Sequence, residues 1–247
     1  MLKLSVLPFK DLLLYKKNLA KSIYECNKLQ NMRNIEVSPS IISSDLSDLR
    51  SEIKKCEDAG AGSFHLDVMD GNFVDNITMG PDLIRAVRKS TKLRLDAHLM
   101  INRPDKYYRD FLSAGADVLL IHYESPVDIG ELINKFERDG IRYGIVINPD
   151  TEFRKVKKYL PGSEILLIMS VYPGFSGQKF INSIISKIKE ASDFIKSEHL
   201  KTRIEVDGGI NDITGKQCVE NGADILVSAS YIFNNDIYKS IQTLKNL

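Results

Sequence analysis

The chain has 247 residues, the length of one large domain or two small ones, since alternating α/β barrels reach about 250 residues as a single domain. With 43% hydrophobic and 27% charged residues, its composition excludes a disordered chain, a collagen-like repeat and a cysteine-stapled scaffold. A net charge of +1 argues against nucleic acid as the main partner, and no apolar run approaches the ~20 residues that span a bilayer.

Residues 1–34 differ from the rest of the chain. The apolar run Leu12–Leu14 is flanked by lysines, is too short for the core of a signal peptide and is followed by no small-residue cleavage site. We predict a short N-terminal extension, helical or disordered, in front of a domain over residues 35–247. A second interpretation takes Met32 as the start of the protein, because the barrel pattern begins at Ile35.

From Ile35 onward, short apolar runs alternate with amphipathic stretches. The runs are rich in Val, Ile and Leu, as strands buried on both faces should be. Eight strands are expected at Glu36–Ser40, Ser63–Val68, Leu93–Leu99, Val118–His122, Arg142–Ile147, Ile165–Val171, Arg203–Val206 and Ile225–Val227. Helices are expected at Leu46–Ala59, Pro81–Lys89, Pro104–Ala114, Ile129–Arg138, Asn182–Glu198 and Ile213–Glu220.

Strands that alternate with helices predict an α/β fold of parallel βα units, and eight such units close into a (β/α)8 TIM barrel. Gly60, Gly115, Gly140 and Gly222 follow predicted helices, where they indicate a helix end before the next strand. An open, doubly wound sheet is the alternative. It is disfavoured because no Gly-x-Gly-x-x-Gly motif follows the first predicted strand.

Polar side chains at the carboxyl ends of barrel strands indicate an active site. His65 and Asp67 are two apart on one predicted strand, so they point the same way. His98 is expected on the next strand and Asp207 at the end of the seventh. Two imidazoles and two carboxylates at one mouth predict a divalent-metal site for Zn, Fe(II), Mn or Co. His122 also ends a strand, and its role as a further ligand stays open.

Small residues and glycines follow the last three predicted strands, at Pro173–Gln178, Gly208-Gly209 and Ser228–Ser230. Backbone N–H groups at such turns can approach an anion closely, and the late loops of a barrel are a common phosphate site. We therefore expect these loops to bind a phosphate group. Three methionines near strand ends are expected to line the same site and exclude water; they are Met69, Met100 and Met169.

Taken together, these motifs resemble the ribulose-phosphate 3-epimerase family of phosphate-binding barrels. The resemblance runs from about Ile35 to the end of the chain and spans all eight predicted strands. The matching segments are Ser38–Ile41 (SPSI), His65–Asn72 (HLDVMDGN), Asn76–Thr78, Asp96–Met100 (DAHLM), Pro173–Gln178 (PGFSGQ), Glu205–Gly209 (EVDGG) and Ser228–Ser230.

The resemblance implies an isomerase of the pentose phosphate pathway that interconverts D-ribulose 5-phosphate and D-xylulose 5-phosphate by inverting C3. It implies that one divalent metal ion binds to His65, Asp67, His98 and Asp207, and that Asp67 and Asp207 are the two acid/base residues. Inversion next to a carbonyl needs a proton removed from one face and returned on the other, which suits two carboxylates. Substrate contacts are implied for Ser40, His98, Gly174, Phe175, Ser176, Gly177, Gly208, Gly209, Ala229 and Ser230.

Two residues depart from the family's usual pattern. Ser176 stands where the family usually has the middle glycine of Gly-Phe-Gly-Gly-Gln, and Ala229 replaces the glycine after the eighth strand. Because both lie in the predicted phosphate loops, D-allulose 6-phosphate, one carbon longer, is the alternative substrate. A non-catalytic phosphosugar-binding relative and a metal-dependent aldolase are the other function classes; an aldolase would release a smaller carbonyl compound.

The predicted partner is a small phosphosugar, with neither nucleic acid nor a membrane. Members of the family form dimers or larger assemblies, so a homo-oligomer is expected. Cys26, Cys56 and Cys218 share no short spacing, which is typical of reduced thiols and predicts a cytoplasmic protein.

Overall fold

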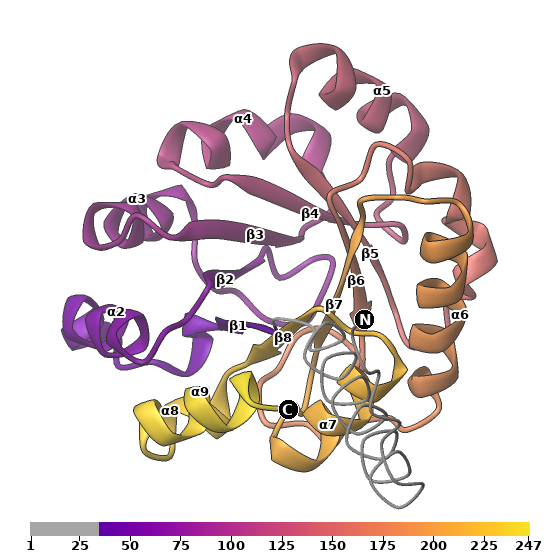
Figure 1. Cartoon of the computed structure of the whole chain (residues 1–247). Coiled ribbons are helices and arrows are strands. Elements are labelled where there is room, and N and C mark those ends of the chain that lie inside the picture. Colours follow the sequence, from indigo (N-terminus) through magenta and orange to yellow (C-terminus); the bar gives the residue numbers. More distant parts are fainter. Residues whose placement is uncertain (1–34) are drawn as a thin grey trace, which may run out of the picture. The chain divides into compact units, whose positions relative to one another are not determined.

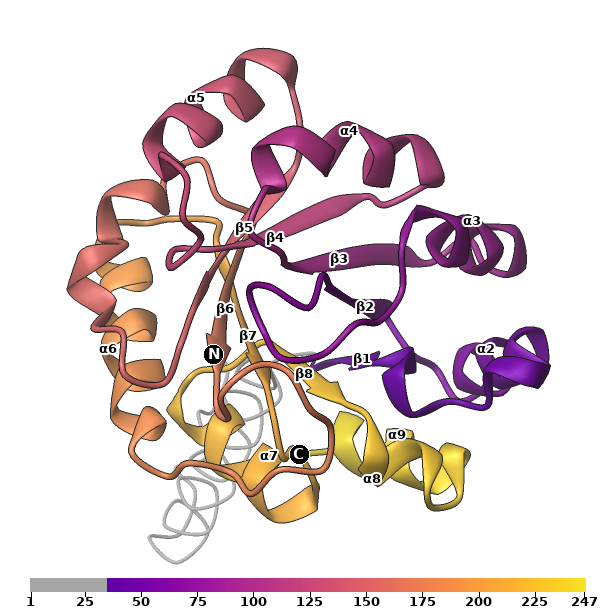
Figure 2. The ribbon, with the colours of Figure 1, turned by 180° about the vertical axis from the view of Figure 1, so that it is seen from behind.

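Eight parallel strands form one sheet that curves into the predicted (β/α)8 barrel, as Figures 1 and 2 show from opposite sides. This computed structural model describes residues 35–247, and the predictions for residues 1–34 lie outside the described residues. The strand order is β1-β8-β7-β6-β5-β4-β3-β2. The strands are β1 (Glu36–Pro39), β2 (Ser63–Met69), β3 (Arg94–Met100), β4 (Val118–His122), β5 (Tyr143–Ile147), β6 (Ile165–Met169), β7 (Arg203–Asp207) and β8 (Ile225–Ser228).

Helices surround the strands on the outside of the barrel (Figure 1). They are α2 (Leu49–Asp58), α3 (Pro81–Ser90), α4 (Pro104–Ala114), α5 (Ile129–Asp139), α6 (Ile184–Ser197), α7 (Asp212–Asn221), α8 (Ser230–Phe233) and α9 (Ile237–Lys245). Gly115 and Gly140 end α4 and α5, as the sequence predicted, and both adopt the left-handed conformation. Among the described residues, no helix has the length and apolar character needed to cross a bilayer.

The structure differs from the predicted helices in three places. The first predicted helix begins as a separate 3-10 turn, η2 (Leu46–Asp48), and η1 (Ile41–Ser43) precedes it. Two short 3-10 turns, η3 (Phe153–Lys155) and η4 (Lys157–Tyr159), connect β5 to β6. The helices α8 and α9 follow β8, where none was predicted.

The barrel closes between its first two strands with few backbone contacts. Glu36 and Ser40 donate their backbone N–H groups to carbonyl oxygens of β8 and the residue before it. The backbone groups of the alternate residues Val37 and Pro39 therefore point toward β2. Val37 accepts the N–H of Gly62, whereas Pro39 has no N–H to donate. A single parallel bridge between Ser40 and His65 completes the contact, and it places both residues at the edge of the site.

The barrel interior is apolar on one side and polar on the other. Its apolar cluster comes mainly from β4, β5, β6 and β8 and consists of Val118, Leu120, Val146, Ile165, Leu167, Met169, Val171 and Ile225. Its polar side comes mainly from β2, β3 and β7 and includes His65, Asp67, Asp96, His98 and Glu205, all buried. Buried polar groups are costly unless they are hydrogen-bonded, so this side needs a dense network of contacts.

Candidate active site and metal centre

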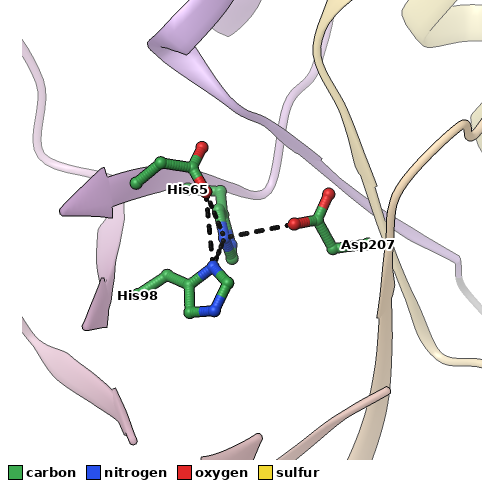
Figure 3. A group of neighbouring side chains, drawn as sticks. His65, His98 and Asp207 are labelled. Carbon is green, nitrogen blue, oxygen red and sulfur yellow. Dashed lines mark hydrogen bonds and ion pairs between the residues drawn. The ribbon is translucent and has the colours of Figure 1, made fainter. Parts of the chain in front are cut away.

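Four side chains from β2, β3 and β7 meet at the carboxyl ends of these strands. His65, Asp67, His98 and Asp207 each place a ligand atom within 4.8 Å of the other three. Strand pairing sets Asp67 directly beside His98, and β7 ends at Asp207, which faces His65 in Figure 3. The structure therefore brings together the four residues that the sequence singled out.

The spacing of these atoms fits a small divalent ion. His65 Nε2 lies 3.1 Å from His98 Nδ1, 3.5 Å from Asp67 Oδ1 and 3.8 Å from Asp207 Oδ2. Ligands about 2.1 Å from a tetrahedral ion lie about 3.4 Å from one another. Two imidazole nitrogens and two carboxylate oxygens also form a donor set that suits first-row divalent metals.

Neighbouring polar groups orient two of these residues. The hydroxyl of Ser40 donates to Asp67 Oδ2, which leaves Oδ1 facing the histidines. Glu205 Oε1 lies 2.9 Å from His65 Nδ1, so the carboxylate accepts that N–H and leaves Nε2 directed into the cluster. Glu205 belongs to the EVDGG motif, but the sequence analysis assigned it no role.

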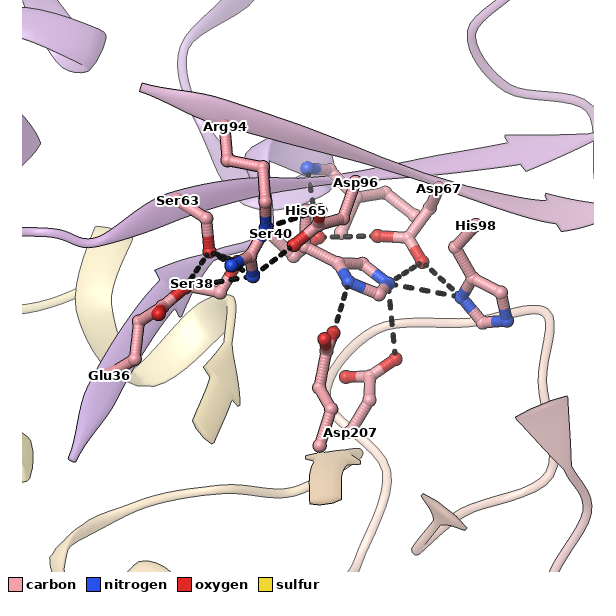
Figure 4. Close-up of polar contacts among 12 residues, drawn as sticks. Glu36, Ser38, Ser40, Ser63, His65, Asp67, Arg94, Asp96, His98 and Asp207 are labelled. Atoms are coloured by element: carbon pink, nitrogen blue, oxygen red, sulfur yellow. Dashed lines mark hydrogen bonds and ion pairs between the residues drawn. The ribbon is translucent and has the colours of Figure 1, made fainter. Parts of the chain in front are cut away.

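A layer of charged side chains lies deeper in the barrel (Figure 4). Arg94 donates two hydrogen bonds of 2.7 Å to Asp96 and lies 2.8 Å from Glu36. Arg203 contacts the other oxygen of Glu36 at 2.5 Å. Burial raises the pKa of Asp96 to about 6, against the opposing effect of Arg94. The arginines supply positive charge beneath a site that is rich in carboxylates.

Burial and mutual contact separate the pKa values of the four clustered residues. Burial lowers the pKa of His98 to about 3. It also opposes a charge on His65, but the carboxylates of Asp67 and Glu205 more than offset it and raise that pKa well above its usual value. Burial likewise works against ionised Asp67, yet the two histidines hold its pKa below the usual range. For Asp207, burial dominates and raises the pKa to about 7.

A cavity of about 510 Å³ opens above the cluster. Asp67 and Asp207 line it, whereas His65 and His98 lie behind them with no exposed surface. The other predicted site residues that line it are Ser40, Met69, Met100, Met169, Gly174, Phe175, Ser176, Gly177, Gly208, Gly209, Ala229 and Ser230. The structure therefore brings every predicted substrate contact except His98 to one cavity. The sequence analysis missed further lining residues, among them Asn211, Thr214, Tyr231, Asn234 and Asn235.

The loops after β6, β7 and β8 have backbone conformations that fit their residues. Gly209 has φ +62°, and a Cβ there would lie 2.8 Å from the backbone N of Phe180. Ala229, in contrast, has φ −111°, outside the left-handed region that favours glycine. Ser176 places its hydroxyl 2.9 Å from that of Ser43. Neither Ser176 nor Ala229 has a positive φ, so neither stands at a position whose backbone requires glycine.

His122 does not belong to the cluster of four. Its Nε2 lies 2.9 Å from His98 Nε2, the nitrogen on the far side of that ring. Its Nδ1 lies 3.1 Å from Glu124, a residue that the sequence analysis missed. The sequence signal that could have identified Glu124 is its carboxylate, which lies two positions after a histidine at a predicted strand end.

Solved structures confirm the barrel architecture. The 3-hexulose-6-phosphate synthase of Salmonella typhimurium is similar with a TM-score of 0.63 and 18% identity, over 86% of this chain and 97% of that chain. Thiamine phosphate pyrophosphorylase from Pyrococcus furiosus is similar with a TM-score of 0.58 and 15% identity, over 87% and 96% of the two chains. At such low identity, these similarities show the fold alone.

Sequence comparison is more specific. The family model described as "Ribulose-phosphate 3 epimerase family" matches residues 36–233. A ribulose-phosphate 3-epimerase of Chlamydia pneumoniae is 42% identical over 210 residues, which cover 84% of this chain and 92% of the relative. The Bacillus subtilis protein of the same name is 42% identical over 213 residues, which cover 85% and 98%. The chain therefore belongs to the ribulose-phosphate 3-epimerase family.

Proposed function

We propose that this protein is an isomerase that interconverts D-ribulose 5-phosphate and D-xylulose 5-phosphate by inverting C3, and that residues 35–247 form its catalytic domain. The observation that carries the proposal is the pair Asp67 and Asp207. These carboxylates come from strands β2 and β7, line one cavity and flank the two histidines. The family membership supports the same reaction.

Asp67 and Asp207 have the properties that two-sided proton transfer requires. Asp67, with its lowered pKa, is the stronger candidate to accept the C3 proton as a carboxylate. Asp207, on β7, is the candidate to return a proton from the other face; in the metal-free site burial raises its pKa to about 7. The roles exchange in the reverse reaction. The residue that returned its proton then acts as the base, and the residue that accepted the C3 proton acts as the acid.

His65, Asp67, His98 and Asp207 would together hold one divalent ion. When bound, such an ion supplies a Lewis acid that stabilises negative charge developing on the substrate's carbonyl oxygen. Ser40 orients Asp67 by donating to its other oxygen. Met69, Met100 and Met169 line the cavity around the carboxylates and exclude water, which strengthens electrostatic interactions there.

The loops after β6, β7 and β8 are proposed to hold the substrate's phosphate. Their lining residues share the cavity with the two carboxylates, at the side of the barrel that β7 and β8 form. Glycines at 174, 177, 208 and 209 have positive φ, which turns backbone N–H groups in directions that other residues rarely adopt. A phosphosugar bound there would reach Asp67 and Asp207 with its carbon chain.

Proton NMR of ribulose 5-phosphate in D2O with the full chain and Zn²⁺ tests the reaction. We expect the C3 proton signal to disappear as xylulose 5-phosphate appears. Release of a smaller carbonyl compound would identify an aldolase instead. D-allulose 6-phosphate is the second substrate to test, because Ser176 and Ala229 alter the loops that hold the phosphate. Binding of both sugars without exchange would contradict an enzymatic function.

Gly209→Ala is expected to raise KM for the phosphosugar about 10-fold, with a smaller change in kcat. The new Cβ would clash with backbone atoms of Phe180 and Gln178, and the left-handed φ costs a non-glycine residue about 1–2 kcal/mol. Gly140→Ala is the matched control, because Gly140 has a similar φ of +66° with nothing within 4 Å of the new Cβ. Equal KM values for the two variants would exclude a role of Gly209 in phosphate binding. Steady-state kinetics makes the comparison.

The buried thiols of Cys56 and Cys218 support the proposal that the enzyme works in the cytoplasm, where thiols stay reduced. The identity of the metal, among Zn, Fe(II), Mn and Co, and the homo-oligomer stay predictions.

A further inference from the structure

A row of three side chains, none of which lines the substrate cavity, begins at the cluster and consists of His98, His122 and Glu124. His98 points its Nδ1 toward His65 and Asp67, and its other ring nitrogen points away from them (Figure 3). That nitrogen, Nε2, lies 2.9 Å from His122 Nε2, and His122 Nδ1 lies 3.1 Å from Glu124 Oε2. The reaction proposed above uses neither His122 nor Glu124.

Counting protons along this row gives one arrangement that permits metal binding. A neutral imidazole carries a single N–H, so His98 can bind an ion through Nδ1 only when its proton is on Nε2. His98 then donates to His122 Nε2, which must be bare, and the proton of His122 must be on Nδ1. In the opposite arrangement, His122 Nε2 donates to His98, and the proton of His98 occupies the nitrogen that would bind the ion.

Glu124 selects the first arrangement because an ionised carboxylate only accepts hydrogen bonds. Its Oε1 accepts the backbone N–H of Asn148 at 2.9 Å and the hydroxyl of Thr151. Its Oε2 is thereby turned to His122, which must donate from Nδ1.

The surroundings leave His122 and His98 little choice of other partners. Both rings have no exposed surface, and the Phe73 ring lies 4.8 Å from that of His122. Breaking the contact between the rings would therefore leave a buried N–H without a partner, which is costly.

We propose that Glu124 and His122 are positioning residues that hold His98 in the tautomer whose Nδ1 is free to bind a divalent cation. The inference rests on the proposed metal site. Glu205 orients His65 by a direct hydrogen bond, whereas Glu124 would orient His98 through the intervening ring of His122.

Nitrogen-15 NMR of the full chain, labelled at histidine and loaded with Zn²⁺, tests the tautomers directly. The chain has only 4 histidines, so assignment by single substitutions is tractable. We expect the proton of His98 on Nε2 and that of His122 on Nδ1. A proton on His122 Nε2 would overturn the proposal, whatever any variant does.

Glu124→Gln supplies the second measurement. Two donors, from Asn148 and Thr151, will hold the amide oxygen, so the new NH2 group faces His122 Nδ1 and favours the opposite arrangement. We expect Zn²⁺ affinity, measured by competition with a chromophoric chelator, to fall about 10- to 100-fold. Glu137→Gln is the matched control, because that carboxylate accepts the Tyr143 hydroxyl at 2.9 Å away from the cluster and should leave the affinity unchanged.

Two outcomes separate this inference from the proposed function. Glu124→Gln with wild-type affinity and wild-type tautomers would overturn the role of Glu124 and leave the metal site intact. Failure of the wild-type chain to bind Zn²⁺ would overturn the metal site itself, and the positioning role with it.

Discussion

Asp207→Asn is expected to abolish net epimerisation, with turnover reduced by about 10²–10⁴-fold, the range that one general acid or base contributes. Asparagine keeps the shape and one oxygen ligand of aspartate but cannot deliver or accept the proton. Asp67 remains, so exchange of the C3 proton with solvent from one face should persist after formation of xylulose 5-phosphate has stopped. Proton NMR in D2O measures both processes in the same sample.

The control for this prediction is Asp212→Asn. Asp212 is an exposed carboxylate in the first turn of α7, five residues after Asp207, and it does not line the cavity. The control should retain wild-type turnover. Full epimerisation by Asp207→Asn would remove Asp207 from the reaction.

Removal of divalent ions from the full chain is expected to reduce turnover by at least about 10³-fold, since a Lewis acid contributes several kcal/mol to charge stabilisation. Addition of Zn²⁺, Fe²⁺, Mn²⁺ or Co²⁺ should restore activity, and the extent of recovery with each ion ranks the metals. A chelator-treated protein, checked for residual metal by elemental analysis, makes the test decisive. Normal turnover by the metal-free protein would contradict the proposed site.

The affinity for the metal should fall as pH falls. In the metal-free site, Asp67 and Glu205 raise the pKa of His65 against the effect of burial, and burial raises that of Asp207 to about 7. Both residues therefore hold protons near neutral pH that ligands must lose, so metal binding releases protons and strengthens with rising pH. Calorimetry in two buffers of different ionisation enthalpy counts the protons released. A proton count of zero would show that the cluster is already deprotonated.

Hydrophobic periodicity predicted most of the fold. Every predicted strand is present with ends within two residues, because strands buried on both faces leave uninterrupted apolar runs. The last helix, α9, was missed although Ile237, Ile241 and Leu244 follow helical spacing. The earlier helices were recognised between two predicted strands, whereas no predicted strand follows the segment after β8. The 3-10 turns between β5 and β6 carry no helical period that distinguishes them from a loop.

By itself, the sequence determined which residue types stand at the strand ends. His65 and Asp67 share a face because side chains alternate along a strand, and that follows from local geometry alone. Only the tertiary structure decided the register that sets Asp67 beside His98, and the ring contact that makes His122 a neighbour of His98 instead of a fifth ligand of the cluster. Register and ring contacts depend on how distant strands pack around the barrel, and periodicity along one strand carries no information about its neighbour.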